Sequence, residues 1–271
     1  MPTHSYLAAD EELQHLCLKA FESLIRLNET AEAEHQAGKG GPLLHGALLS
    51  MTSDMLCLHR SVWCLCNGGW AFATPVLLRT MMDLIISTLA VTHREEDREY
   101  MGFKYMYGFQ KEGLATLEAP TSVKEEARAD IANAIQHLSA DDQARAKAFL
   151  EAKLETYWYS PEYRKPSDVL AKTGSNPVLK RVYALFSGAA HAGFAGLREF
   201  RDQPWIIDSA PRADKVSQNR ALFLSARLLL EFAAMRANVE APAAARLFGR
   251  LISELADAST RCRVTPNLAD L

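Results

Sequence analysis

Apolar residues recur every three or four positions over most of the chain, and this spacing limits what the chain can fold into. It is the pattern of amphipathic α-helices, and the alternating pattern of β-strands is missing. Glycine and proline, which interrupt helices, number only 14 and 11 among 271 residues. The sequence therefore predicts an all-α protein: a single multi-helix bundle of about eight to nine helices with short loops.

Short groups of Gly, Pro and Asn set the predicted helix ends, and Ser139 is the predicted cap of the helix that follows it. The predicted helices span residues 8–37, 43–66, 74–91, 94–118, 123–138, 140–156, 177–191, 214–239 and 243–261. Irregular loops are expected at 157–166 and 200–213, and a short turn at 167–173. No repeat of 20–50 residues is present, so we expect one helical domain over 1–271. It begins with an acidic N-terminal helix within 1–37 and ends in a disordered tail at 264–271.

Charge and cysteine content narrow the class of protein. The 30 basic and 33 acidic residues give a net charge of -3, which excludes a general nucleic-acid coat. The first 30 residues hold no apolar run behind a basic start, so no secretory signal is predicted. The five cysteines are an odd number without framework spacing, which is typical of reduced thiols. We expect a cytoplasmic protein.

The stretch 70–91 is apolar nearly all round, but Arg79 and Asp83 interrupt it. Each charge would cost roughly 2.5–3.5 kcal/mol at a bilayer centre, so we expect a core helix and no membrane association. Residues four apart share one helix face, so the two side chains can pair. Such a pair either fixes the register of a buried helix or belongs to a functional site.

Three polar residues line one face of the predicted helix 177–191: Tyr183, Ser187 and His191. Small residues surround them and would allow another helix to come close. A hydroxyl four residues before an imidazole is the minimal arrangement for an activated nucleophile, although buried Ser and His often only satisfy each other. Because Arg79 and Asp83 need partners, we predict that they meet Ser187 and His191 in one buried polar cluster. These four residues are the candidate catalytic residues.

These two motifs resemble those of a known family. The stretch from Arg79 to Asp83 is similar to an Arg-Ser…Glu signature of a family of bacterial all-helical proteins of unknown function, with Thr80 where Ser is common and Asp83 where Glu is usual. The spacing Tyr-x3-Ser-x3-His from Tyr183 to His191 resembles the second signature of that family. Trp158 is similar to a family tryptophan. The resemblance covers roughly residues 45–195.

That family is distantly similar to helical-bundle toxins and defence nucleases. The resemblance implies an alternative function, a metal-independent ribonuclease-like enzyme of a toxin or defence system that acts on RNA. Those enzymes use an Arg followed four to six residues later by His, and that spacing is absent here. Arg79 and His191 would have to come together from different helices.

Aromatic residues next to cations favour contact with a ligand or partner. Such residues occur in both predicted loops and beside the polar stripe, and the candidate ligand-binding residues are Tyr183, Trp158, Tyr163, Arg164 and Trp205. The alternative is that Trp158 closes one end of the bundle, since large aromatic side chains are usually well buried.

No metal site or cofactor is predicted. Cys57 and Cys64 share one helix face while His59 and Cys66 share another, so the four cannot converge on one ion. The spacings Glu12-x-x-His15 and Glu32-x-x-His35 resemble those of di-iron bundles, but both lie on one helix. Phosphate-binding glycine loops and the Gly-x-Ser-x-Gly elbow are missing from the sequence.

Two predicted helices, near 43–66 and 214–236, are apolar on more than one face. Residues such as Leu222, Phe223, Leu229, Leu230 and Phe232 need a second cover, either a neighbouring helix or another chain. A homodimer is the commonest such solution. The sequence thus predicts a cytosolic helical binding or interaction module that forms a homodimer and takes a small ligand or a protein partner. Its buried polar cluster would be either structural or a pocket for a small ligand.

Overall fold

The computed structural model describes residues 10–116, 120–152, 157–174, 179–184, 215–262 and 264. Within them every regular element is helical, which confirms the all-α prediction. The α-helices are α1 (Glu11–Gln36), α2 (Pro42–Asn67), α3 (Thr74–Thr92), α4 (Arg98–Thr116), α5 (Thr121–Gln136), α6 (Ala140–Glu151), α7 (Pro166–Lys172), α10 (Lys215–Glu240) and α11 (Ala245–Arg261). Residues 179–184 are also helical, and single 3-10 turns occupy 71–73, 95–97 and 242–244.

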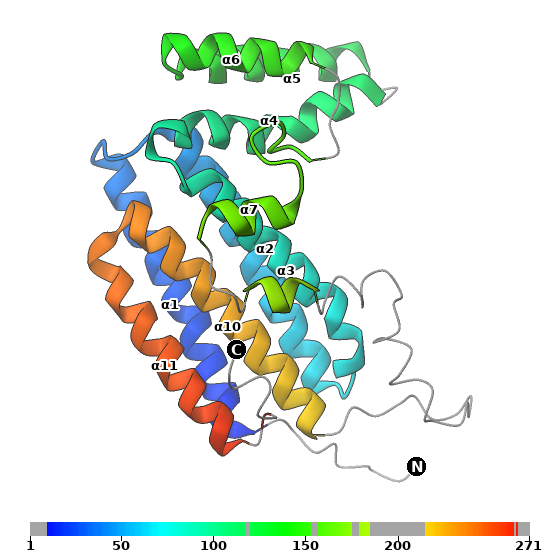
Figure 1. Cartoon of the computed structure of the whole chain (residues 1–271), viewed down its shortest axis with the longest axis vertical. Helices are drawn as coiled ribbons and strands as arrows, with labels where there is room; N and C mark the ends of the chain where they lie inside the picture. The colour runs from blue at the N-terminus through cyan, green and yellow to red at the C-terminus, as the bar shows by residue number, and fades with distance from the viewer. Residues whose placement is uncertain are drawn as a thin grey trace.

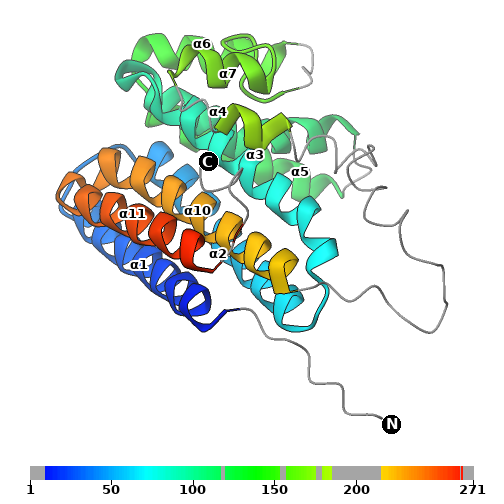
Figure 2. The same cartoon turned by 60° about the horizontal axis from the view of Figure 1, so that its bottom comes forward.

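The helix α10 lies at the centre of the bundle, packed against α1, α2, α3 and α11 (Figures 1 and 2). A helix that is apolar on more than one face must be covered on each of them. The sequence left open whether a second chain covers the apolar residues of this helix. All of them are buried within this one chain: Leu222, Phe223, Leu229, Leu230 and Phe232. The cover that they need is therefore supplied by neighbouring helices.

A second group of helices packs on one side of this bundle. The helix α4 contacts α2 and α3, and α5 and α6 in turn lie on α4 (Figure 1). Gly102 allows the close approach of α4, because a Cβ there would lie 2.7 Å from the carbonyl carbon and oxygen of Leu43. The Glu99 carboxylate accepts hydrogen bonds from the backbone N–H groups of Leu43 and Leu44, both at 3.1 Å, and so caps α2.

Some local predictions hold and others need correction. Ser139 caps α6, since its hydroxyl accepts from the N–H of Asp142 as expected. Residues 166–172, predicted as a turn, form the short helix α7 against α3. Pro75 stands in the first turn of α3, where its missing N–H costs nothing. Val264, at the start of the predicted tail, is buried, and residues 265–271 lie outside the described part.

Within the described residues, α3 is the helix that is long and apolar enough to cross a membrane. Length and composition alone are weak grounds, because a core helix passes the same test. The helix packs against α2, α4, α7 and α10, and 56% of its most apolar window is buried inside the protein. This packing agrees with the expectation of a core helix.

Candidate functional site

Arg79 and Asp83 form the predicted pair on α3. The Arg79 Nε donates to Oδ2 of Asp83 at 3.1 Å, and Nη2 lies 3.1 Å from Oδ1. Both carboxylate oxygens thus face one guanidinium, a forked geometry that fixes the direction of the carboxylate.

Tyr183 completes this centre from the helical residues 179–184. Its hydroxyl accepts a hydrogen bond of 2.8 Å from Arg79 Nη2, and its backbone carbonyl accepts from Nη1 at 3.4 Å. The guanidinium carbon also lies 3.8 Å from the ring centre. Arg79 is held by the ring, the hydroxyl and the backbone of one residue, a role that the sequence did not assign to Tyr183.

The pair is less buried than the sequence predicted. The Arg79 side chain is 14% exposed, but that of Asp83 is 50% exposed. The reason is that α3 turns one side outward, and Asp83 lies on it. Where the carboxyl faces the protein, loss of water raises the pKa of Asp83, and the charge and hydrogen bond of Arg79 oppose that rise. The site is a half-open carboxylate anchored on a largely buried guanidinium.

Aromatic side chains of residues 157–163 lie beside this centre. The rings of Tyr157 and Tyr159 stack with centres 5.3 Å apart, and Trp158 packs edge-on against Tyr105 of α4. Burial raises the pKa of Tyr159, and the neighbouring charges of Tyr157, Tyr183 and Asp83 raise it further. The predicted loop is therefore a packed aromatic cluster.

The other candidate residues differ in burial and in their contacts. Trp158 is half-buried between α4 and its own segment, which fits the packing alternative. Tyr163 is buried, with the Lys172 ammonium 5.3 Å from its ring centre, while Arg164 is exposed. Ser187, His191 and Trp205 lie outside the described residues. The meeting of Ser187 and His191 with Arg79 and Asp83, and the ligand-binding role of Trp205, therefore stay predictions.

A second charged centre lies around Lys104 of α4 and was not predicted from the sequence. This lysine is fully buried, and its Nζ donates to the Ser160 carbonyl and to Glu162, both at 2.5 Å. Arg145 of α6 lies 3.9 Å above the ring centre of Tyr100 and 3.8 Å from Glu162. These contacts tie α4 and α6 to the aromatic segment and so position it beside α3.

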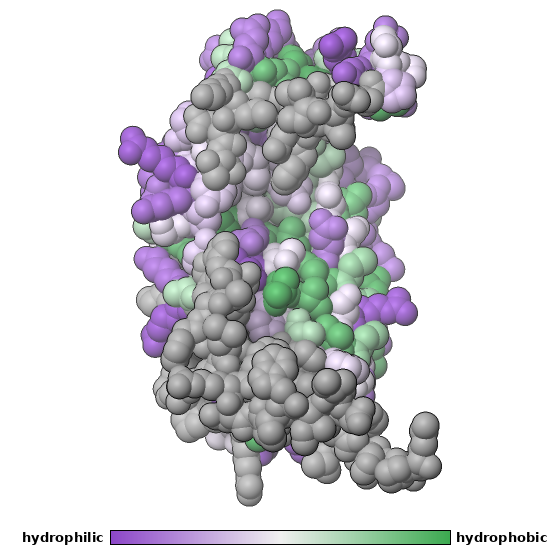
Figure 3. All heavy atoms as spheres, turned by 90° about the vertical axis from the view of Figure 1, so that its right-hand side faces the viewer, coloured by the Kyte–Doolittle hydropathy of each residue, from purple (hydrophilic) through white to green (hydrophobic). Residues whose placement is uncertain are grey.

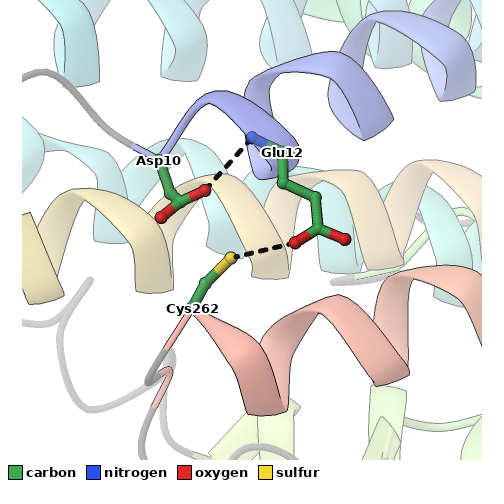
Figure 4. A group of neighbouring side chains, drawn as sticks. All are labelled: Asp10, Glu12 and Cys262. Carbon is green, nitrogen blue, oxygen red and sulfur yellow. Dashed lines mark hydrogen bonds between the residues drawn. The ribbon is translucent and has the colours of Figure 1, made fainter.

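Potential metal ligands come together at the ends of α1 and α11. The ligand atoms of Asp10, Glu12 and Cys262 lie within 4.8 Å of one another (Figure 4). Asp10, however, caps α1 by accepting from the Glu12 N–H, and Glu12 pairs with Arg261 at 2.5 Å. Burial raises the pKa of Cys262 to about 11, which keeps the thiol protonated. The group is accounted for by its own contacts.

The cysteines of α2 behave as the helix geometry predicted. Cys57 and Cys64 are exposed, whereas His59 and Cys66 are buried on the other side of the helix. The four side chains therefore point to opposite sides and offer no common ligand set.

Residues 45–204 match the model of a family of unknown function, DUF5677. This range is 160 of the 271 residues and contains Arg79, Asp83, Tyr183 and the aromatic segment. No curated protein and no solved structure matches the chain. Because the match covers more than half of the chain and includes both sequence motifs, the protein belongs to the DUF5677 family.

Proposed function

We propose that the chain is a helical interaction module that pairs with a second copy of itself through the outward face of α3. The observation that carries this proposal is the exposure of Val76, Thr80 and Asp83. Spaced i, i+4, i+7, they form one row on the helix. The Val76 side chain is 57% exposed, on the helix richest in apolar residues. Unpaired apolar surface on such a helix is typical of an interface.

The surroundings of this row support a contact between copies. Trp70, just before α3, is 46% exposed, and Trp and Arg are the side chains that contribute most at interfaces. In the space-filling view of Figure 3, apolar side chains gather at the middle of the face that carries α3 in Figure 1. Where the structure describes this face, polar side chains lie on both sides of the apolar ones, an arrangement that is common at interfaces.

Charge favours an identical partner. The half-exposed Asp83 carboxylate lies next to residues 179–184, on which Lys180 and Arg181 are exposed. A two-fold axis near Asp83 would place the carboxylate of each copy opposite these cations of the other. The ion pairs would steer association, and Val76 would supply the buried area.

Sedimentation velocity over a roughly hundredfold range of concentration tests the proposal. We expect a dimer whose affinity falls at least about tenfold in Val76→Asp, because a carboxylate would be buried at the contact. Leu247→Asp is the matched control, since Leu247 is 37% exposed on α11, away from α3. A monomer at every concentration, or equal loss in both variants, would refute the proposed interface.

A second function, the ribonuclease-like enzyme, is favoured by the charge around the site. Residues 157–174 and 179–184 carry five basic side chains, Arg164, Lys165, Lys172, Lys180 and Arg181, against Glu162 and Asp168. A basic rim suits an RNA backbone. Incubation with a defined single-stranded RNA in EDTA tests this function. Cleavage that is abolished in a folded His191→Ala variant would support it. If no RNA is cleaved, the interaction module remains as the proposed function.

A further inference from the structure

A ladder of charged side chains joins three helices at the end of the bundle opposite to Asp10. Glu32 of α1 lies 3.0 Å from His45 Nε2, and His45 Nδ1 lies 2.7 Å from Oε1 of Glu240 in α10. Arg236 Nε then donates to Oε2 of Glu240 at 2.5 Å. The ladder therefore ties the end of α1, the start of α2 and the end of α10 together.

The ladder holds only when the imidazole of His45 carries two protons. An ionised carboxylate can only accept a hydrogen bond, and a neutral imidazole has a single N–H. Both ring nitrogens of His45 face carboxylates. When the ring loses one proton, one nitrogen becomes an acceptor that faces an acceptor oxygen, so that hydrogen bond is lost. The hydrogen bond from His45 is the main reason why the pKa of Glu32 is lowered, with Gln36 adding to it.

Burial decides which contact breaks. The side chains of His45 and Glu240 are 10% exposed and Arg236 is fully buried, so Glu240 keeps its partners in either state. Arg236 also donates to Asn28 at 2.8 Å and to Thr52, which fixes it between α1 and α2. Glu32, at 43% exposed, can turn into water. Glu32 is therefore the group that leaves when His45 is neutral.

Other titratable groups face the ladder from α1 and α4. The His35 ring stacks on that of His45 with centres 4.2 Å apart and planes 10° from parallel. Its Nδ1 is buried without a partner in the described part of the chain. Two nearly parallel rings cannot direct their nitrogens at one metal ion. Burial raises the pKa of the Glu99 carboxylate, which caps α2, and the charges of His35 and His137 oppose that rise.

We propose that Glu32, His45 and Glu240 form a proton-operated latch. With His45 charged, the latch ties the last turn of α1 to α2 and α10. When His45 is neutral, the hydrogen bond between Glu32 and His45 is lost, and the last turn of α1 and residues 37–41 open. Loss of the second imidazole proton as the pH rises is therefore the event that opens the latch.

Hydrogen exchange of backbone amides tests the latch. After correction for the intrinsic rates, we expect protection of residues 32–37 to fall roughly tenfold from about pH 6 to pH 8. Glu32→Gln should remove this dependence, because an amide can accept from the charged ring or donate to the neutral one. Glu34→Gln is the control: it lies on the same turn but pairs with Lys39, and should keep the dependence.

The protonation of His45 is followed separately by nitrogen NMR of the intact protein, which requires no variant. The latch predicts two protonated ring nitrogens at the lower pH and one at the higher. A neutral ring throughout, or protection that is equal at both pH values, would overturn it.

Discussion

The guanidinium carbon of Arg79 lies 3.8 Å from the centre of the Tyr183 ring, and Nη2 of the same side chain donates to the hydroxyl of that ring. The two residues are 104 positions apart and belong to different helices. This contact orients Arg79, and Arg79 in turn orients the half-exposed carboxylate of Asp83. This oriented carboxylate at the surface is the feature on which the proposed contact between two copies depends.

Tyr183→Phe removes the hydroxyl and keeps the ring. We expect the free energy of unfolding to fall by about 1.5 kcal/mol, since hydrogen bonds to charged groups contribute about 1.5–3 kcal/mol. Tyr183→Ala should lose about 1 kcal/mol more with the stacked ring. Urea denaturation measures both. A Phe variant as stable as the parent would mean that the hydroxyl contributes nothing.

Asp83→Ala should cost only about 1 kcal/mol, the usual contribution of an exposed ion pair. A fully buried pair would have cost about 3–5 kcal/mol, but here water reaches Asp83 and Tyr183 still holds Arg79. Thr80→Ala, one turn away on the exposed row, is the control and should change stability by less than about 0.5 kcal/mol. Urea denaturation measures the free energy of unfolding of both variants. A decrease of more than about 3 kcal/mol in Asp83→Ala would contradict the half-exposed site.

His59 should make the fold sensitive to acid. Burial lowers the pKa of His59 from 6.5 to about 4, although its contact with the Cys17 carbonyl opposes this. Between these pH values the unfolded chain binds a proton that the folded chain does not, so stability falls as the pH falls. The loss should be roughly 2 kcal/mol by about pH 5.

Denaturation curves from pH 7 to pH 5 measure this dependence. Asp83 and Glu99, whose pKa values burial raises, act in the opposite direction, so the slopes of variants must be compared. His59→Gln should flatten the acid slope, whereas His15→Gln, at an exposed position of α1, should leave it unchanged. Parallel slopes for all three proteins would rule out His59 as the cause.

Two glycines should respond to alanine in opposite ways. Gly102→Ala places a methyl group against the backbone of Leu43 and should cost about 2–3 kcal/mol, because main chain cannot move aside cheaply. Gly249→Ala, on the exposed side of α11 with nothing within 4 Å, should stabilise the protein by about 0.5–1 kcal/mol. Thermal unfolding distinguishes them, and similar shifts would show that α4 does not pack as tightly as described.

Much of the fold could be predicted from local patterns. Helix ends follow nearby Gly, Pro and Ser, as at Ser139, and the Arg79–Asp83 pair follows from four-residue spacing on one helix. Such features depend on residues within a turn or two of each other, so the sequence by itself determined them. The need of α10 for neighbours on more than one face could also be predicted from its apolar residues.

Only the tertiary structure decided which helices cover α10 and where charged side chains are buried. Lys104 and Glu162 are 58 residues apart, and Arg236 and Asn28 are 208 apart, so no local pattern announces either contact. Asp83 is half exposed because α3 turns that side away from its neighbours, although its sequence is apolar around the charge. Burying a charge is tolerated only when partners from other helices arrive together, and that depends on how the helices pack rather than on any one of them.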